Sequence, residues 1–349
     1  MAFRVFCQTL VLLSLVAAAR IVNAQTLRPS PPPEDEVLRV TTNLVTVPVA
    51  VKDRKGKTLF DLRQHDFHLY EDGVEQSIAY FDGPQLINEG ARQVSPGLQR
   101  PLIVAVLLDV SDSTELKLQA IKDSAIAFVE KLAPEDRVVL MAFDKNVRTI
   151  AGPDDNRETL RAEVQKLRTG RGTSVYDAVD SITTWLGKIS GRKVIVLLTD
   201  GVDTASQKGT YLGTIAAAEH LDAALYPIQF NTYADFADDP SRQMGPLGGT
   251  ATTHMTRNGE LASEAYKRAT RYLRELAEKT GGQFEYGDSV KNLARSFEHV
   301  AERVRDEYTL GFYPRDQSKK GRRQLTVRVE VPGASAKTRK TYILKPSSK

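Results

Sequence analysis

The hydrophobic pattern of this chain alternates between short apolar runs and longer segments with helical spacing. Residues 102–108 and 193–198 have almost no polar interruption, which is typical of strands buried on both faces in a parallel sheet. Between such runs, apolar residues recur every three or four positions, as on one face of an amphipathic helix. The pattern predicts strands at 102–108, 137–143, 193–198, 225–230 and 283–286, a hairpin partner at 147–151, and helices at 116–132, 156–167, 175–188, 211–224, 262–280 and 290–304.

The two ends of the chain have a different pattern, rich in β-branched residues with partial alternation. It predicts strands within 38–51 and at 67–70, 76–81, 306–313, 324–331 and 338–344. Because the first group is marginal by itself, we expect it to combine with the last group. The expected fold class is α/β, with a Rossmann-like, doubly wound and mostly parallel sheet and a smaller antiparallel β-rich domain formed from the N- and C-terminal segments.

The first residues of the chain predict secretion. A basic start at Arg4 precedes an apolar stretch, and Val22-Asn23-Ala24 has the small-x-small pattern of a cleavage site. The alternative is a signal anchor, although the apolar stretch is short for a membrane span. We therefore expect a secreted or periplasmic protein. The predicted organisation is a signal peptide at 1–24, a Pro-rich tether at 25–36, a β-rich segment at 37–83, a linker at 84–100, the main domain at 101–287, a helix at 288–306 and a second β-rich segment at 307–349.

Composition and charge exclude some classes of protein. The 349 residues are 41% hydrophobic and 26% charged, which is ordinary for a globular protein. Without Arg4 and Arg20 of the predicted signal peptide, the formal charge of +4 falls to +2, which is too small to favour nucleic acid. Cys7, the one cysteine, lies in the predicted signal peptide, so the mature protein would have no thiol. A basic run is interpreted as the charged tip of a hairpin: Lys319, Lys320, Arg322 and Arg323.

Oxygen-bearing side chains follow two of the predicted buried strands. Asp109, Ser111 and Ser113 come directly after the first, and Asp200 ends a later one. Thr173 lies in a glycine-bearing loop before a helix. Because ligands bind outside the carboxyl ends of strands in open α/β sheets, these side chains could converge at one edge. Two carboxylates and three hydroxyls suit Mg²⁺, with Ca²⁺ or Mn²⁺ as alternatives.

Each of these residues also has a purely structural interpretation. Ser113, together with Thr114, could cap the helix that follows, and Asp200 could be a turn aspartate ahead of Gly201. The irregular segment 231–261 is expected to border the same edge of the sheet. There His254, Met244 and Met255 are candidates to contact a partner, although loop residues without a function are the favoured interpretation.

The set Asp109-Val110-Ser111-Asp112-Ser113, then Thr173, then Asp200-Gly201 resembles the metal-ion-dependent adhesion site of von Willebrand factor type A domains. The resemblance covers about residues 101–286. It implies a divalent cation, commonly Mg²⁺, with Ser111, Ser113 and Thr173 as direct ligands and the two aspartates often acting through water. The flanking β segments resemble those of secreted bacterial VWFA-related proteins.

The sequence does not favour an enzyme. It has no G-x-S-x-G motif, Gly170-Arg171-Gly172-Thr173 lacks the surroundings of a phosphate-binding loop, and His65 and His68 lie far from other ligand candidates. The resemblance implies a cation-dependent protein-binding module for adhesion or assembly outside the cytoplasm. An acidic residue of the partner would complete the coordination of the cation. Alternatives are a structural envelope protein whose metal only stabilises loops and, less favoured, a metal-dependent hydrolase. No nucleic acid and no membrane span after signal cleavage are expected.

Overall fold

The computed structural model describes residues 44–84, 101–189, 191–230, 232, 256, 258–316 and 321–344. These residues belong to one compact unit, 42–349. The predicted signal peptide, the tether, nearly all of the linker and most of segment 231–261, including Met244, His254 and Met255, lie outside the described residues, as do Lys319 and Lys320.

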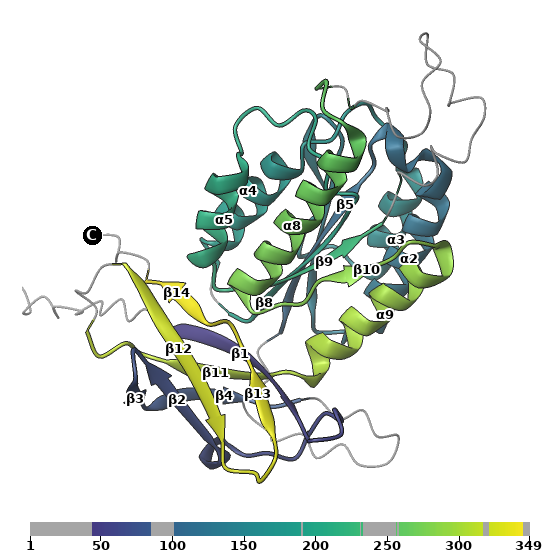
Figure 1. Ribbon diagram of the computed structural model, residues 1–349. Helices are drawn as coiled ribbons and strands as arrows, with labels where there is room; N and C mark the ends of the chain where they lie inside the picture. The colour runs from purple at the N-terminus through teal and green to yellow at the C-terminus, as the bar shows by residue number, and fades with distance from the viewer. Residues whose placement is uncertain are drawn as a thin grey trace, which may run out of the picture. The chain divides into compact units, whose positions relative to one another are not determined.

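A six-stranded sheet forms the centre of the α/β part, in the order β10-β9-β8-β5-β6-β7 (Figure 1). Its pairs are parallel except for the edge strand β7, which returns antiparallel to β6. The expected fold class is therefore confirmed. The strands are β5 (Ile103–Asp109), β6 (Arg137–Phe143), β7 (Val147–Ala151), β8 (Lys193–Thr199), β9 (Ala224–Gln229) and β10 (Glu285–Tyr286).

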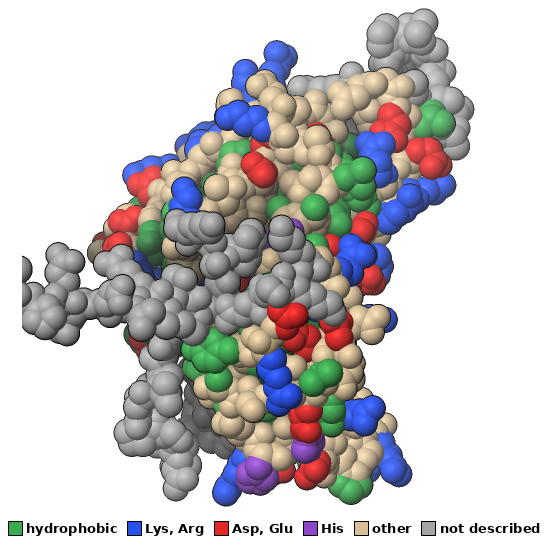
Figure 2. All heavy atoms as spheres, turned by 90° about the vertical axis from the view of Figure 1, so that its left-hand side faces the viewer, with side chains coloured by type: hydrophobic (Ala, Val, Ile, Leu, Met, Phe, Trp, Pro, Cys, Tyr) green, Lys and Arg blue, Asp and Glu red, His purple; other side chains and the backbone are tan. Residues whose placement is uncertain are grey.

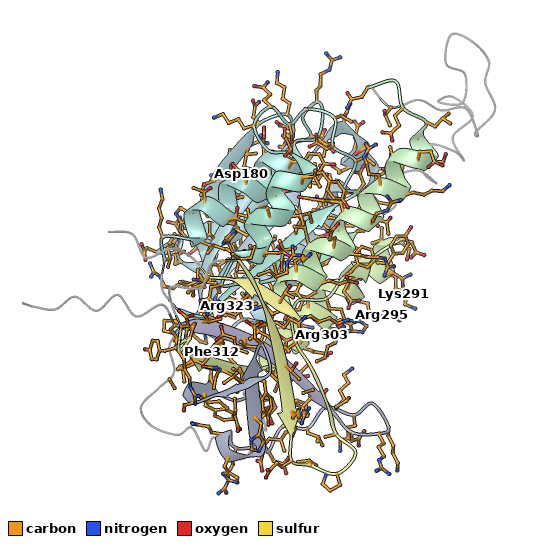
Figure 3. All side chains as sticks on the ribbon, turned by 60° about the vertical axis from the view of Figure 1, so that its left-hand side comes forward. Asp180, Lys291, Arg295, Arg303, Phe312 and Arg323 are labelled. Atoms are coloured by element: carbon orange, nitrogen blue, oxygen red, sulfur yellow. The ribbon has the colours of Figure 1, made fainter. Side chains whose placement is uncertain are left out.

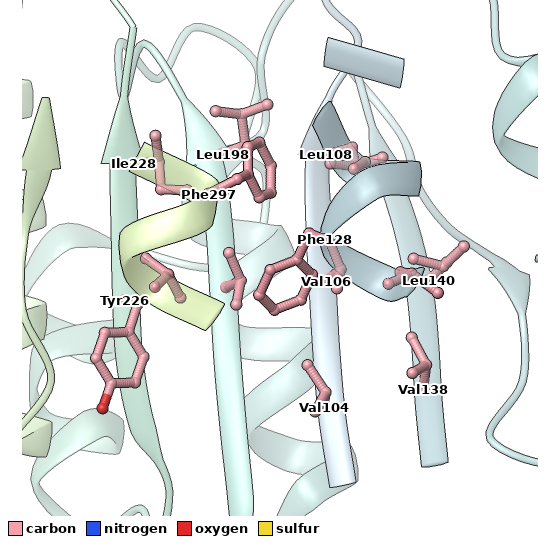
Figure 4. Packing of buried hydrophobic residues seen from close by; sticks show 14 of the residues in the cluster. Val104, Val106, Leu108, Phe128, Val138, Leu140, Leu198, Tyr226, Ile228 and Phe297 are labelled. Carbon is pink, nitrogen blue, oxygen red and sulfur yellow. The ribbon is translucent and has the colours of Figure 1, made fainter. Parts of the chain in front are cut away.

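Helices cover both faces of this sheet (Figure 1). Strand β5 is buried along its whole length because its alternate residues enter two different cores. Val104, Val106 and Leu108 face one set of helices, where the rings of Phe128 and Phe297 lie 5.7 Å apart (Figure 4). The helices of that face are α2 (Leu118–Lys131), α3 (Arg157–Lys166) and α9 (Val290–Asp306), and those of the other face are α4 (Val175–Leu186), α5 (Tyr211–Glu219) and α8 (Ala262–Thr280).

The two β-rich ends combine, as the sequence predicts, into two four-stranded antiparallel sheets around one apolar core. Each sheet takes strands from both ends of the chain. The first has the order β13-β1-β11-β4 and the second β14-β12-β2-β3. Their bounds are β1 (Val45–Lys52), β2 (Phe67–Glu71), β3 (Val74–Gln76), β4 (Ile78–Asp82), β11 (Tyr308–Phe312), β12 (Arg322–Val329), β13 (Ser335–Lys337) and β14 (Thr341–Ile343), with a 3₁₀ turn η1 (Gln64–Asp66) before β2.

Two predicted elements differ from the structure. The strand expected at 76–81 is two strands, because the chain changes sheet at Ser77: β3 pairs with β2, whereas β4 pairs with β11. The helix expected at 211–224 ends at Glu219, and the apolar residues after it form a turn and the start of β9. Apolar residues at a helix end and in a buried strand look alike in sequence, which explains the second error.

The interpretation of Arg323 as part of an exposed charge run was wrong. Its side chain is fully buried, and its Nη1 donates to Glu71 Oε1 at 2.8 Å. The carboxylate also accepts a hydrogen bond from the Tyr342 hydroxyl. Figure 3 labels Arg323 and Phe312, which come from the two different sheets of this β part. The alternation along β12 places every second residue inside, so one arginine of the run faces the core.

The surface features agree with the moderate net charge. On the face that Figure 2 shows, acidic and basic side chains are interspersed on both the α/β part and the β part. Among the described residues, no helix combines the length and the apolar character that crossing a membrane would require.

A buried carboxyl lies where α9 passes into β11. Glu307 Oε2 accepts a hydrogen bond from the Tyr226 hydroxyl at 2.5 Å. Burial raises the pKa of Glu307 from 4.5 to about 7, and the hydrogen bond from Tyr226 offsets only part of that rise. Between these two pH values the folded protein holds a proton that the unfolded chain releases.

The free energy of unfolding should therefore fall as the pH rises from about 4.5 to 7. Glu307→Gln keeps an acceptor for Tyr226 and should remove this part of the pH dependence, a change of about 1–3 kcal/mol between pH 4 and 8 relative to the unmodified protein. Urea unfolding across that range measures it. Glu302→Gln, an exposed position on the same helix, is the control, and equal pH profiles for both variants would contradict the assignment.

Candidate metal centre

Two carboxylates lie at the carboxyl ends of neighbouring parallel strands. Asp109 is the last residue of β5, and Asp200 follows the last residue of β8. The side chains are 0% and 2% exposed. Parallel pairing in register brings the two strand ends to the same edge, so the sheet itself sets how close the carboxylates lie.

Hydrogen bonds connect the predicted ligands that follow β5 to those that follow β8. The Ser111 and Ser113 hydroxyl oxygens lie 3.0 Å apart, and Ser113 Oγ donates to Asp200 Oδ2 at 2.9 Å. Asp109 Oδ1 accepts from the backbone N–H of Ser111 at 2.9 Å. Four of the five predicted residues are therefore brought into one hydrogen-bonded group.

The fifth predicted residue, Thr173, is placed by its backbone. Gly170 N–H donates to the Val110 carbonyl at 2.7 Å, and Gly172 N–H donates to Asp112 Oδ1 at 3.3 Å. These bonds hold the loop against the turn that follows β5. Within the described part of the chain, the Thr173 hydroxyl makes no hydrogen bond to the other four predicted ligands, although the residue is only 4% exposed.

The serines do not act as side-chain caps. Ser111 precedes the 3₁₀ helix η2 (Asp112–Lys117) without a side-chain capping bond, and Ser113 lies inside it. Helix α2 begins after Lys117, also without such a bond, so the expected capping by Ser113 or Thr114 is not seen. The Thr114 hydroxyl instead donates to the Ser111 carbonyl at 2.8 Å. The serine hydroxyls are thus directed to the carboxylates rather than to a helix end.

Three side chains that sequence reasoning missed also hold the carboxylates. Thr199 Oγ1 donates to Asp109 Oδ2 at 2.6 Å, and Thr232 Oγ1 donates to Asp200 Oδ2 at 2.9 Å. The Tyr266 hydroxyl hydrogen-bonds with Thr232 and lies 3.5 Å from the same Asp200 oxygen. Thr199 stands next to Asp200 in the sequence and could have been found, whereas nothing in the helical pattern around Tyr266 distinguishes it.

The electrostatics of this group favour a cation. Burial, and then the charge of the neighbouring Asp200, raise the pKa of Asp109 to about 7, and burial raises the pKa of Asp200. No described lysine or arginine forms an ion pair with either carboxylate. A bound cation would offset the cost of burying two like charges.

The donor set fits a hard cation rather than a soft one. In the described ranges, no group of three or more His, Cys, Asp or Glu side chains could hold a metal ion, so a site here must use hydroxyl oxygens as well. Two carboxylates with several hydroxyls match the preference of Mg²⁺ for oxygen ligands. The residues present therefore fit the predicted cation.

Comparison with known proteins shows what the central part of the chain is similar to. The family model of the von Willebrand factor type A domain matches residues 104–202, the stretch that contains all five predicted ligands. Domains of this kind are often metal-dependent protein-interaction modules.

Individual relatives are distant. A "UPF0353 protein" of Mycolicibacterium vanbaalenii is 23% identical over 223 residues, which cover 58% of this chain and 60% of the relative. The chain spans about half to three-fifths of the length of the curated relatives it matches. Among solved structures, a von Willebrand factor type A protein from Catenulispora acidiphila has a TM-score of 0.45 at 11% identity, covering 88% of this chain and 76% of that one. Proximal thread matrix protein 1 from the mussel byssus, with a zinc-occupied MIDAS motif, has a TM-score of 0.43 at 15% identity, covering 63% and 48%.

Gly170 is required where the Thr173 loop crosses the end of β6. A Cβ at this position would lie 2.1 Å from Asp144 Oδ2 and 2.6 Å from its Cγ. Asp144 cannot easily move away, because Arg148 binds the same oxygen and Ser174 hydrogen-bonds to its carbonyl. Contact between the loop and this strand end therefore leaves no room for a side chain.

Gly170→Ala should lower the free energy of unfolding by about 1–3 kcal/mol, because the added methyl group must displace Asp144. Gly152→Ala is the matched control, since its Cβ would meet only Asp155 Oδ2 at an ordinary 3.7 Å. Chemical unfolding of both variants measures the difference. If Gly170→Ala is as stable as Gly152→Ala, the loop is not packed as described.

Proposed function

We propose that the von Willebrand factor type A domain of this chain binds a divalent cation, Mg²⁺ in the first place, and through it a partner protein. The supporting observation is the buried pair Asp109 and Asp200, joined through Ser111 and Ser113 and without a basic partner among the described residues. Such a group is costly to bury unless a cation offsets its charge. Ca²⁺ and Mn²⁺ are the alternatives to Mg²⁺.

Each residue has a proposed role at this site. Ser111, Ser113 and Thr173 would bind the cation directly, and Asp109 and Asp200 would bind it through water. Thr199 and Thr232 would keep the two carboxylates oriented by donating to the oxygens that they already contact. The cation would supply a positive charge and a coordination position that a carboxylate of the partner can fill. An interaction module of this kind needs no catalytic residues.

The place of action that we propose is outside the cytoplasm. The support is the sequence of residues 1–24, which has the basic start, apolar stretch and small-x-small end of a secretory signal. In that setting the protein would act in adhesion or assembly at the cell envelope. Its partner would present an acidic residue to the cation.

Thr173 allows a test that separates cation binding from folding. Because its hydroxyl makes no hydrogen bond to the other predicted ligands, Thr173→Val should leave the free energy of unfolding of the metal-free protein within about 1 kcal/mol. The same variant should bind Mg²⁺ at least tenfold more weakly, because a direct ligand is lost. Calorimetric titration with MgCl₂ and urea unfolding in a chelator measure the two quantities.

The control for this test is Thr183→Val. Thr183 is also buried, and its hydroxyl donates to the Asp180 carbonyl within α4. The Thr183→Val variant should bind Mg²⁺ with the same affinity as the unmodified protein. Equal affinity in Thr173→Val and Thr183→Val would remove Thr173 from the site, and no binding by the unmodified protein would reject the cation altogether.

Partner binding requires a separate experiment. The full chain and Thr173→Val, each immobilised, are exposed to cell-envelope extract from the source organism, with MgCl₂ or with a chelator. We expect at least one protein to be retained only by the unmodified chain and only with Mg²⁺. The proposal would be contradicted if the same proteins were retained with and without the chelator and by both the unmodified chain and Thr173→Val. A loss of thermal stability in the chelator without any retained partner would favour a purely structural cation.

A further inference from the structure

A polar cavity lies at the opposite end of β8 from the candidate metal centre. Its volume is about 360 Å³, within the range of small-ligand sites. Arg192 and Lys193, which precede and begin β8, form part of its wall, whereas Asp200 follows the other end of that strand. A seven-residue strand separates the two places by roughly 23 Å. The cavity therefore belongs to a different site.

The walls of the cavity come from both the α/β part and the β part. The α/β part contributes the turn before β8 and the end of α5, with His220 and Asp222. The β part contributes the start of β1 and the strand β14, with Arg339 just before it. The Thr46 backbone N–H donates to Asp222 Oδ1, and Arg339 Nη1 donates to the Leu221 carbonyl, so hydrogen bonds tie these walls together.

Positive charge exceeds negative charge around this cavity. Asp222 lies 3.8 Å from Lys193 Nζ, and Glu219 is shared by Lys279 and Arg322. Arg192 pairs with Asp82 at 3.4 Å. Arg339 is only 3% exposed and, among the described residues, has no carboxylate partner. Of the side chains that line the cavity, Arg192, Lys193 and Arg339 are cationic, whereas Glu219 and Asp222 are anionic.

Arg339 has incomplete hydrogen bonding as well as uncompensated charge. Its Nη1 and Nη2 donate to the backbone carbonyls of Leu221 and Thr46 at 3.0 and 2.8 Å. Its Nε has no hydrogen-bond partner in the described part of the chain, although it is buried. Burying a guanidinium in this way is costly, and an anion in the cavity beside Arg339 would lower that cost through its charge.

The remaining walls are apolar or aromatic. They consist of the starting residues of β1 and the end of β14, together with Tyr313, which is 44% exposed. A ligand that neutralised the excess charge would therefore also bury carbon atoms against these side chains. The apolar residues are Leu44, Val45, Ile343 and Leu344, with Tyr342 beside them.

We propose that this cavity binds a small organic anion, with a carboxylate directed to Lys193 and Arg339 and an apolar body against β1 and β14. The site does not depend on the candidate metal centre. Lys193 Nζ already donates to the Ile189 carbonyl at 2.9 Å, which fixes the ammonium group at the wall. The anion would join the α/β part to the β part by contacts with both.

Calorimetric titration of the full chain with phenylacetate, in a chelator and at constant ionic strength, tests the proposal. Phenylacetate should bind, and its neutral isostere phenylacetamide should bind at least tenfold more weakly, as expected for the loss of a charge-assisted hydrogen bond. Inorganic phosphate should also bind more weakly because it has no apolar body. Absence of phenylacetate binding overturns the proposal, equal binding of the amide overturns the role of charge, and equal binding of phosphate overturns the role of the apolar walls.

Two pairs of variants locate the binding. Lys193→Gln should weaken phenylacetate binding about tenfold. The matched control is Lys122→Gln, which should leave binding unchanged. Lys122 is a similarly buried lysine that also donates to a backbone carbonyl, at 3.0 Å, but lies away from the cavity. Tyr313→Glu adds a negative charge at an exposed position of the wall and should also weaken binding, so the test survives if Lys193→Gln does not fold. Its control is Tyr286→Glu on β10, which is 47% exposed. Unchanged binding in a folded Lys193→Gln or in Tyr313→Glu would overturn the assignment to this cavity.

Discussion

The arrangement of this protein depends on the burial of β5 on both faces. Every residue of the strand from Ile103 to Asp109 is buried, so the last of them carries a carboxylate into the interior at the edge of the sheet. Parallel pairing with β8 places Asp200 beside it, and neither carboxylate has a described basic partner. Hydroxyl groups from three different segments, those of Ser113, Thr199 and Thr232, donate to these oxygens and hold the carboxylates in one orientation.

The sequence was sufficient where a local pattern decides the structure. The apolar run of β5, the helical spacing of α8 and the oxygen-rich turn after Asp109 could be identified without the fold. The N- and C-terminal strands could be assigned to one unit because neither group can bury enough apolar surface alone. The β13 strand was missed because its three residues, Ser335–Lys337, have no alternation that a reader could detect.

What could not be predicted depends on contacts between residues distant in sequence. Tyr266 reaches Asp200 only because α8 packs on the sheet beside β9. Arg323 is buried because Glu71, from the other end of the chain, supplies the compensating charge. A tyrosine on a helix and an arginine in a basic run do not by themselves indicate a buried position. In both cases the hydrogen-bond partner, Asp200 or Glu71, comes from a segment distant in sequence.

The pairing of strands from opposite ends of the chain limits the order in which the protein can fold. Val45 pairs with Phe312, and His68 pairs with Arg328, so neither β sheet can close until the ribosome has made almost the whole chain. The α/β part has no such requirement, because its strands and helices follow one another in sequence. During synthesis β1 would thus remain unpaired for longest, because both of its partners, β11 and β13, come from the C-terminal part, whereas β2 can already pair with β3. Strand β1 is therefore where a holdase chaperone would have most to protect.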